Sequence, residues 1–130
     1  MSPDLLVQLC GLHSFGFAVF HLAFWKLFDW KLPDWSRDPQ RASLATRAIT
    51  QILNLRLIYV FLGIGVLCFA FTRELHETLL GRAVLVFMSL FWVGRTIEQF
   101  VFLRINRPLV HALTALFVLG AVLFAAPLFV

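Results

Sequence analysis

Four apolar stretches, each long enough to cross a lipid bilayer, occupy almost the whole of this 130-residue chain. A membrane-spanning helix needs about 20 apolar residues, and this length is met by residues 4–28, 43–71, 79–103 and 108–130. Little of the chain is left between them. The sequence therefore predicts an all-α integral membrane protein, a single domain of four transmembrane helices that covers residues 1–130.

The overall composition agrees with that prediction. Hydrophobic residues make up 61% of the chain and charged residues only 14%, whereas soluble domains are about 45–50% apolar and about 25% charged. A chain of this size cannot bury so much apolar surface in one small core. These values exclude a water-soluble globular protein and a disordered chain. Two cysteines supply no disulfide framework.

The basic residues predict how the helices are oriented, because Lys and Arg concentrate in the cytoplasmic connections of membrane proteins. The first connection carries Lys26, Lys31, Arg37, Arg41 and Arg47, and the third carries Arg104 and Arg107. We therefore expect connections one and three in the cytoplasm and both termini outward, in a bacterial inner membrane. The net charge of +4 then reflects this topology and contact with anionic lipid, and no nucleic-acid partner is expected.

Polar residues inside the spans are the main functional signal, since an ionisable side chain in hydrocarbon costs about 2.5–3.5 kcal/mol on insertion scales. Counting about 1.5 Å of rise per residue places one set of them in the cytoplasmic half of the membrane. That set is His21, Gln51, Asn54, Arg56, Arg95, Glu98 and His111. Because it comes from all four helices, it predicts one polar chamber that opens toward the cytoplasm.

Helical periodicity predicts which of these residues share a face. In the third span Arg95, Glu98 and Gln99 lie on one stripe, so Arg95 and Glu98 can pair within the helix. A purely structural ion pair is an alternative reading of the same two residues.

The second span carries polar residues on two sides. Arg47, Gln51 and Asn54 form one stripe, whereas Arg56 lies about 200° around the helix from Asn54. One four-helix bundle cannot satisfy both faces. We therefore expect a homo-oligomer in which one of them meets another subunit. Gln51 and Asn54 can alternatively serve as interhelical hydrogen bonds.

The arginines could form a site for an acidic ligand, because a guanidinium binds a carboxylate bidentately. The predicted substrate-binding residues are Arg47, Gln51, Asn54, Arg56, Arg95 and Glu98, with His21, Gln99 and His111 as polar neighbours. Apolar walls around them would suit a lipophilic small molecule that enters from the bilayer. No residue is assigned a catalytic role, and no metal-ligand spacing is present.

Part of this polar set resembles a known family. Residues 47–54 read Arg-Ala-Ile-Thr-Gln-Ile-Leu-Asn, with the spacing of the Arg-x-x-x-Asn-x-x-Glu pattern in the second span of the membrane-associated proteins in eicosanoid and glutathione metabolism (MAPEG). Residues 95–102 and Pro108 resemble that family's third-span pattern, Arg-x-x-His-x-x-x-Tyr followed by a proline. Glu98 and Phe102 stand where the family has histidine and tyrosine, so the two arginines carry the match.

The resemblance implies a homotrimer that binds glutathione between subunits on the cytoplasmic side. It would place glutathione contacts on Arg47 and Arg95, and further contacts on Gln51 and Asn54. The implied activity is that of a glutathione-dependent transferase or isomerase acting on a lipophilic substrate.

Other function classes remain open. Ionisable residues inside spans also mark transporters, channels and proton relays, and polar groups that only lock helices together would indicate a structural accessory subunit. A four-helix bundle can hold haem between facing histidines. His21 and His111 supply one such pair at most, and glutathione, not haem, is the expected ligand.

Overall fold

The computed structural model describes residues 2–32 and 41–130, and every regular element in that part of the chain is a helix. The elements are α1 (Pro3–Leu22), α2 (Phe24–Leu27), α3 (Arg41–Ala70), α4 (Thr72–Glu77), α5 (Leu79–Phe102), α6 (Pro108–Ala125) and the 3₁₀ turn η1 (Ala126–Leu128). The all-α prediction is thus confirmed for the described residues. Arg37 and the side chain of Arg41, part of the predicted basic first connection, lie outside them.

Four helical segments are long and apolar enough to cross a membrane: Pro3–Leu27, Ser43–Ala70, Leu79–Phe102 and Pro108–Leu128. They match the predicted spans to within a few residues. The first span differs from the prediction because it is not one continuous helix. Its backbone breaks at Ala23, whose N–H is shared between the carbonyls of Val19 and Phe20, a bifurcated bond common at helix ends.

Local sequence signals explain where the spanning helices begin. The Ser2 hydroxyl accepts a 3.2 Å hydrogen bond from the N–H of Leu5, and Pro3 occupies the first turn of α1. The Thr78 hydroxyl does the same for α5, accepting a 3.0 Å bond from the N–H of Gly81. Each cap satisfies a backbone donor that the first helical turn leaves without a partner.

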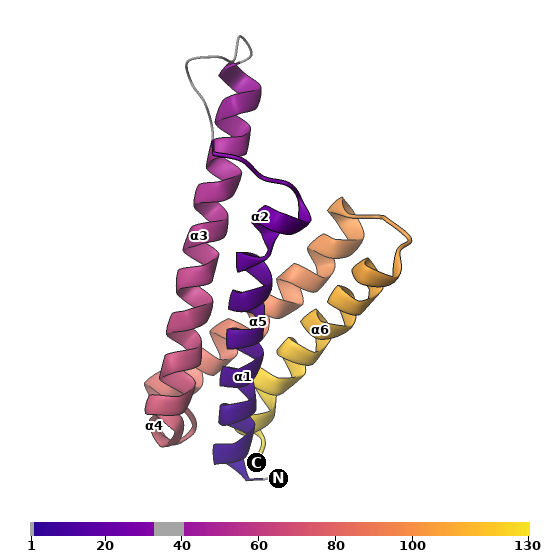
Figure 1. Cartoon of the computed structure of the whole chain (residues 1–130). Helices are drawn as coiled ribbons and strands as arrows, with labels where there is room; N and C mark the ends of the chain where they lie inside the picture. The colour runs from indigo at the N-terminus through magenta and orange to yellow at the C-terminus, as the bar shows by residue number, and fades with distance from the viewer. Residues whose placement is uncertain (1, 33–40) are drawn as a thin grey trace.

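The spanning helices form two antiparallel pairs, α1 with α3 and α5 with α6 (Figure 1). The pairs lie close together at the end that holds both termini, and they separate toward the opposite end, which carries the first and third connections (Figure 1). Both termini therefore lie at one end of the molecule, as predicted. Which side of a membrane that end faces stays a prediction.

The closed end is held by polar contacts between elements. His76 Nε2 of α4 lies 2.6 Å from Asp4 Oδ1 of α1. Arg82 of α5 donates to the carbonyl of Leu128 at 2.9 Å and to that of His76 at 3.3 Å. These bonds join α1, α4, α5 and η1, so the two helix pairs are fixed to each other beside the termini.

The aromatic core lies where the two pairs meet. Trp92 of α5 is 1% exposed, and its ring lies 4.7 Å from that of Phe17 on α1. The ring centroids of Phe61 on α3 and Phe117 on α6 are each 5.6 Å from it, on stacked planes. Trp92 thus contacts an aromatic ring from each of the other three spans.

Candidate binding site

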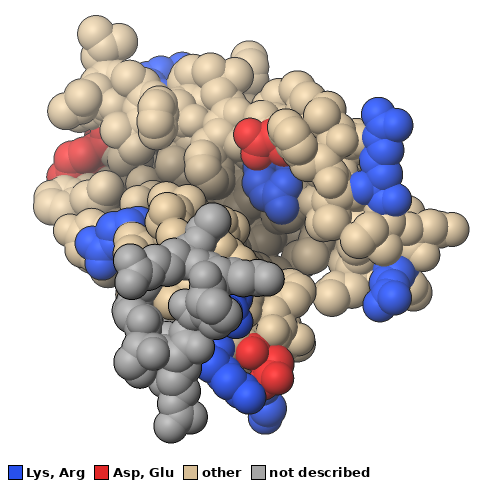
Figure 2. Space-filling model, turned by 90° about the horizontal axis from the view of Figure 1, so that it is seen from above, with Lys and Arg blue, Asp and Glu red and all other residues tan. Residues whose placement is uncertain are grey.

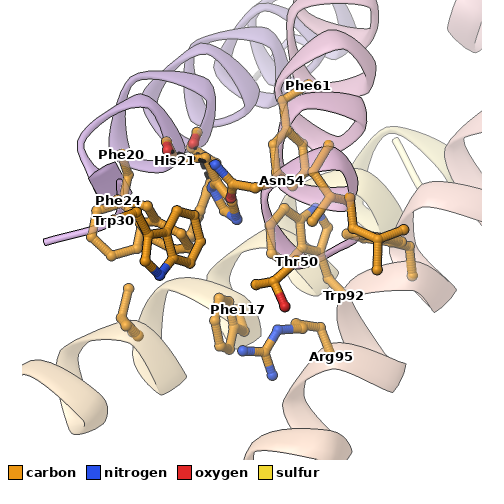
Figure 3. Close-up of a pocket in the computed structure, with 15 residues that line it drawn as sticks. Phe20, His21, Phe24, Trp30, Thr50, Asn54, Phe61, Trp92, Arg95 and Phe117 are labelled. Atoms are coloured by element: carbon orange, nitrogen blue, oxygen red, sulfur yellow. Dashed lines mark hydrogen bonds between the residues drawn. The ribbon is translucent and has the colours of Figure 1, made fainter. Parts of the chain in front are cut away.

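A cleft of about 320 Å³ opens above this core, between the two helix pairs. Its walls are mainly aromatic: Phe17, Phe20, Phe24, Trp30, Phe61, Phe91, Trp92 and Phe117. Its polar lining residues are His21, Thr50, Asn54 and Arg95 (Figure 3). From the end that carries the first and third connections, the surface is hollowed between the helices, and Lys and Arg side chains lie around this face with a few Asp and Glu side chains among them (Figure 2).

Arg95 is the charged residue of the cleft. Its half-buried side chain extends from α5, and the guanidinium carbon lies 4.6 Å from the centre of the Phe117 ring, a cation–π contact (Figure 3). Within the described part of the chain Arg95 makes no ion pair. The cleft therefore contains a cation whose side chain packs on the face of an aromatic ring.

The predicted pairing of Arg95 with Glu98 is an electrostatic interaction within α5 and not a direct ion pair, because no oxygen of Glu98 comes within ion-pair distance of the guanidinium. Glu98 is exposed, and the Arg95 guanidinium is turned toward Phe117 instead. The buried stripe of α5 runs through Trp92 and Gln99. Glu98 lies about 100° around the helix from Gln99, which places it outside the contact with α6.

His21 and Asn54 form the opposite wall. The Asn54 side-chain amide donates a 2.9 Å hydrogen bond to the backbone carbonyl of His21. His21 Nδ1 lies 2.8 Å from the carbonyl of Phe17. Because a carbonyl only accepts, Nδ1 carries the proton, and in the neutral ring Nε2 is the acceptor. The wall thus holds an imidazole with a defined tautomer.

Gln51 and Arg47, from the same predicted stripe as Asn54, do not line this cleft. The Gln51 side chain is buried, with its oxygen accepting from Trp25 Nε1 at 3.1 Å and its amide donating to the Lys31 carbonyl at 2.9 Å. It therefore fixes the start of the first connection to α3. Arg47 is exposed one turn nearer the start of α3.

The remaining predicted residues lie elsewhere as well. Gln99 is buried and donates to the Val110 carbonyl at 3.3 Å, which joins α5 to α6. His111 is exposed and bonds Asn106 at 2.7 Å. Because His111 does not line the cleft that contains His21, the structure does not bring this pair together for haem. Arg56 is exposed on the outer side of α3.

The single polar chamber predicted from seven residues is thus reduced to three of them, His21, Asn54 and Arg95. Sequence reasoning missed Thr50, although it lies one turn before Asn54 on the same stripe and helical spacing could have indicated it. It also missed Trp30, because a tryptophan near the end of a span is typical of the membrane interface and does not by itself indicate a cleft. Trp92 lines the cleft too, and its buried Nε1–H has no acceptor within the described residues.

No protein-family model, curated protein or solved structure matches the chain. The resemblance to the MAPEG family therefore stays a prediction. Among the described residues no group of three His, Cys, Asp or Glu side chains could hold a metal ion.

Proposed function

We propose that this chain is an integral membrane protein whose cleft binds a lipophilic small molecule with an acidic group. The observation that carries the proposal is the position of Arg95, a cation over the Phe117 ring inside a mainly aromatic cleft. Guanidinium groups bind carboxylates and phosphates in a fixed, bidentate geometry. Aromatic walls accept an apolar chain, and the volume of about 320 Å³ falls within the range of small-molecule sites.

The energetics of Arg95 support an anionic ligand. An arginine within a span costs about 2.5–3.5 kcal/mol on insertion scales, whereas a cation–π contact returns about 0.5–2 kcal/mol. An acidic ligand would add charge-assisted hydrogen bonds worth about 1.5–3 kcal/mol. Binding would therefore remove a cost that the ring of Phe117 offsets only in part.

The ligand would reach the cleft from the cytoplasmic leaflet. The open end of the molecule is also the basic end, where Lys26, Lys31, Arg104 and Arg107 lie exposed. The positive-inside rule places such an end in the cytoplasm, with both termini outward, in the proposed setting of a bacterial inner membrane.

A glutathione-dependent transferase or isomerase is the more specific form of this proposal. Glutathione carries two carboxylates, and the cleft offers one cation, Arg95. The second cation in the family-based prediction, Arg47, does not line the cleft. Glutathione binding would therefore need Arg47 to contact the ligand from outside the cleft, as Arg47 would do in a site shared between subunits.

The experiment compares an acid with an alcohol of the same chain length. The protein is placed in phosphatidylcholine nanodiscs and loaded with cis-parinaric acid, whose fluorescence is excited by energy transfer from tryptophans such as Trp30 and Trp92 in the cleft. Palmitic acid and hexadecanol then compete for the probe, with empty nanodiscs correcting for partition into lipid. We expect the acid to compete at least tenfold better, since a charged hydrogen bond is worth about 1.5–3 kcal/mol.

Two variants make the comparison specific to the cleft. Arg95→Gln should remove the preference for the acid, whereas Arg104→Gln, in the exposed third connection, should retain it. Equal competition by acid and alcohol in the unmodified protein would overturn the proposal. Calorimetry with glutathione on the same sample tests the more specific form.

A further inference from the structure

Arg56 places a charge on the outer, exposed surface of α3, in the middle of a span. It lies 13 residues after Ser43 and 14 before Ala70, the bounds of the second span, which is about 20 Å from either end. A hydrocarbon core about 30 Å thick centred on this span would leave Arg56 about 15 Å from either surface, farther than an extended arginine side chain reaches. Among the described residues the side chain of Arg56 contacts Tyr59, with the guanidinium carbon 5.5 Å from the centre of the ring.

The surface beside Arg56 is an apolar groove. An open hollow of about 650 Å³ on the exposed side of α3 is lined by Tyr59, Val60, Leu62, Gly63, Ile64, Val66 and Leu67. A Cβ added at Gly63 would meet nothing within 4 Å, so this part of the helix is uncovered in the single chain. Small residues of this kind let a neighbouring helix approach closely in a membrane. Together with Arg56, the groove forms a face suited to another protein segment that carries an anion.

Glu98 is the matching anion. The chain has seven acidic residues, and Glu98 is the one that lies inside a span beyond its first turn. It is exposed on α5 and interacts electrostatically with Arg95 of the same helix, but no described cation lies within ion-pair distance of it. Glu98 lies 19 residues after Leu79, about 28 Å along the axis. Because α5 is inclined relative to α3 (Figure 1), its depth approaches that of Arg56.

We propose that a second copy of this chain covers the α3 face, with Arg56 of one subunit paired with Glu98 of the next. Each subunit carries both halves of the contact on different helices, α3 and α5, so the same contact can repeat around a closed ring. The pair neutralises two charges that a single chain leaves exposed to lipid. This inference concerns the outer surface and is independent of ligand binding in the cleft.

Charge reversal tests the proposed pair. The oligomeric state of the protein is measured by native mass spectrometry from nanodiscs. We expect the unmodified chain to be oligomeric, Arg56→Glu and Glu98→Arg each to shift it to monomer, and the double variant to restore the oligomer. Arg104→Glu, which reverses an exposed charge in the third connection, should leave the oligomer intact. A monomeric unmodified protein, or single variants that remain oligomeric, would overturn the proposal.

A crosslinking measurement covers the case in which charge reversal prevents folding. Arg56→Cys and Glu98→Cys are introduced together in a chain with Cys10→Ala and Cys68→Ala, and membranes are treated with copper phenanthroline. An intermolecular disulfide between positions 56 and 98 is the expected product. A control with Arg104→Cys in place of Arg56→Cys should give none. Absence of a crosslink between positions 56 and 98 would contradict the proposed interface.

Discussion

The side-chain amide of Asn54 donates a 2.9 Å hydrogen bond to the backbone carbonyl of His21, so the second span holds the last turn of the first. That carbonyl is one of the last four of α1, the positions at which a helix end does not supply the regular i+4 N–H donor. Asn54 is 4% exposed. The bond therefore satisfies a backbone group in apolar surroundings, and it also sets the position of the His21 wall of the cleft.

Replacing Asn54 with leucine should therefore destabilise the protein. We expect a loss of about 0.6–1.7 kcal/mol, the range found for polar contacts between membrane helices, measured as the free energy of unfolding in mixed micelles. Thr50→Val is the matched control, because the Thr50 hydroxyl bonds the Thr46 carbonyl of its own helix. Equal losses for the two variants would show that the contact between helices contributes nothing of its own.

Two glycines of α5 should respond differently to alanine. A Cβ at Gly81 would clash with the backbone of Glu74 and Leu75 in α4, whereas a Cβ at Gly94 would meet nothing within 4 Å. Because backbone atoms cannot rotate away, we expect Gly81→Ala to cost about 1–3 kcal/mol. Gly94→Ala should be neutral or stabilise by up to about 1 kcal/mol. Thermal unfolding in detergent, followed by circular dichroism, measures both, and an unaffected Gly81→Ala would contradict the close packing of α4 on α5.

The contact between Asp4 and His76 should be energetically coupled. Their side chains are 45% and 11% exposed and lie 2.6 Å apart, which joins the start of α1 to α4. A double-mutant cycle with Asp4→Asn and His76→Gln should give a coupling energy of about 1 kcal/mol. The same cycle with Arg73→Gln should give a value near zero, since Arg73 is 77% exposed and 3.9 Å from Asp4. Coupling in both cycles, or in neither, would contradict the geometry.

The spans were predictable because the length of an apolar stretch is a direct physical requirement of the bilayer. The sides of the second span on which its polar residues lie were predictable too, since helical periodicity fixes which residues share a side of a helix. Asn54 and Gln51 are buried and Arg56 is exposed. The break at Ala23 was not predictable, because nothing in the surrounding apolar sequence marks the end of a helix.

The site was predicted less well than the fold, and the reason lies in how α5 packs. Periodicity places Arg95, Glu98 and Gln99 on one stripe but does not say which neighbouring helix covers it. The α6 contact lies along the line of Trp92 and Gln99, so Arg95 reaches the cleft and Glu98 remains outside. That outcome depends on the separation of the two helix pairs (Figure 1), which no local sequence signal indicates.

The orientation in the membrane gives the last prediction. Single cysteines are introduced in a chain with Cys10→Ala and Cys68→Ala. The native thiols are 0% and 1% exposed, and replacing them ensures that any label reports on the introduced cysteine. Arg104→Cys reports on the third connection, and Glu77→Cys reports on the end that holds the termini. A membrane-impermeant maleimide should label position 77 in spheroplasts and position 104 only in inverted vesicles, because basic connections stay in the cytoplasm. The reverse pattern would place the open cleft on the outer side, and an acidic ligand would then have to reach Arg95 from the outer leaflet.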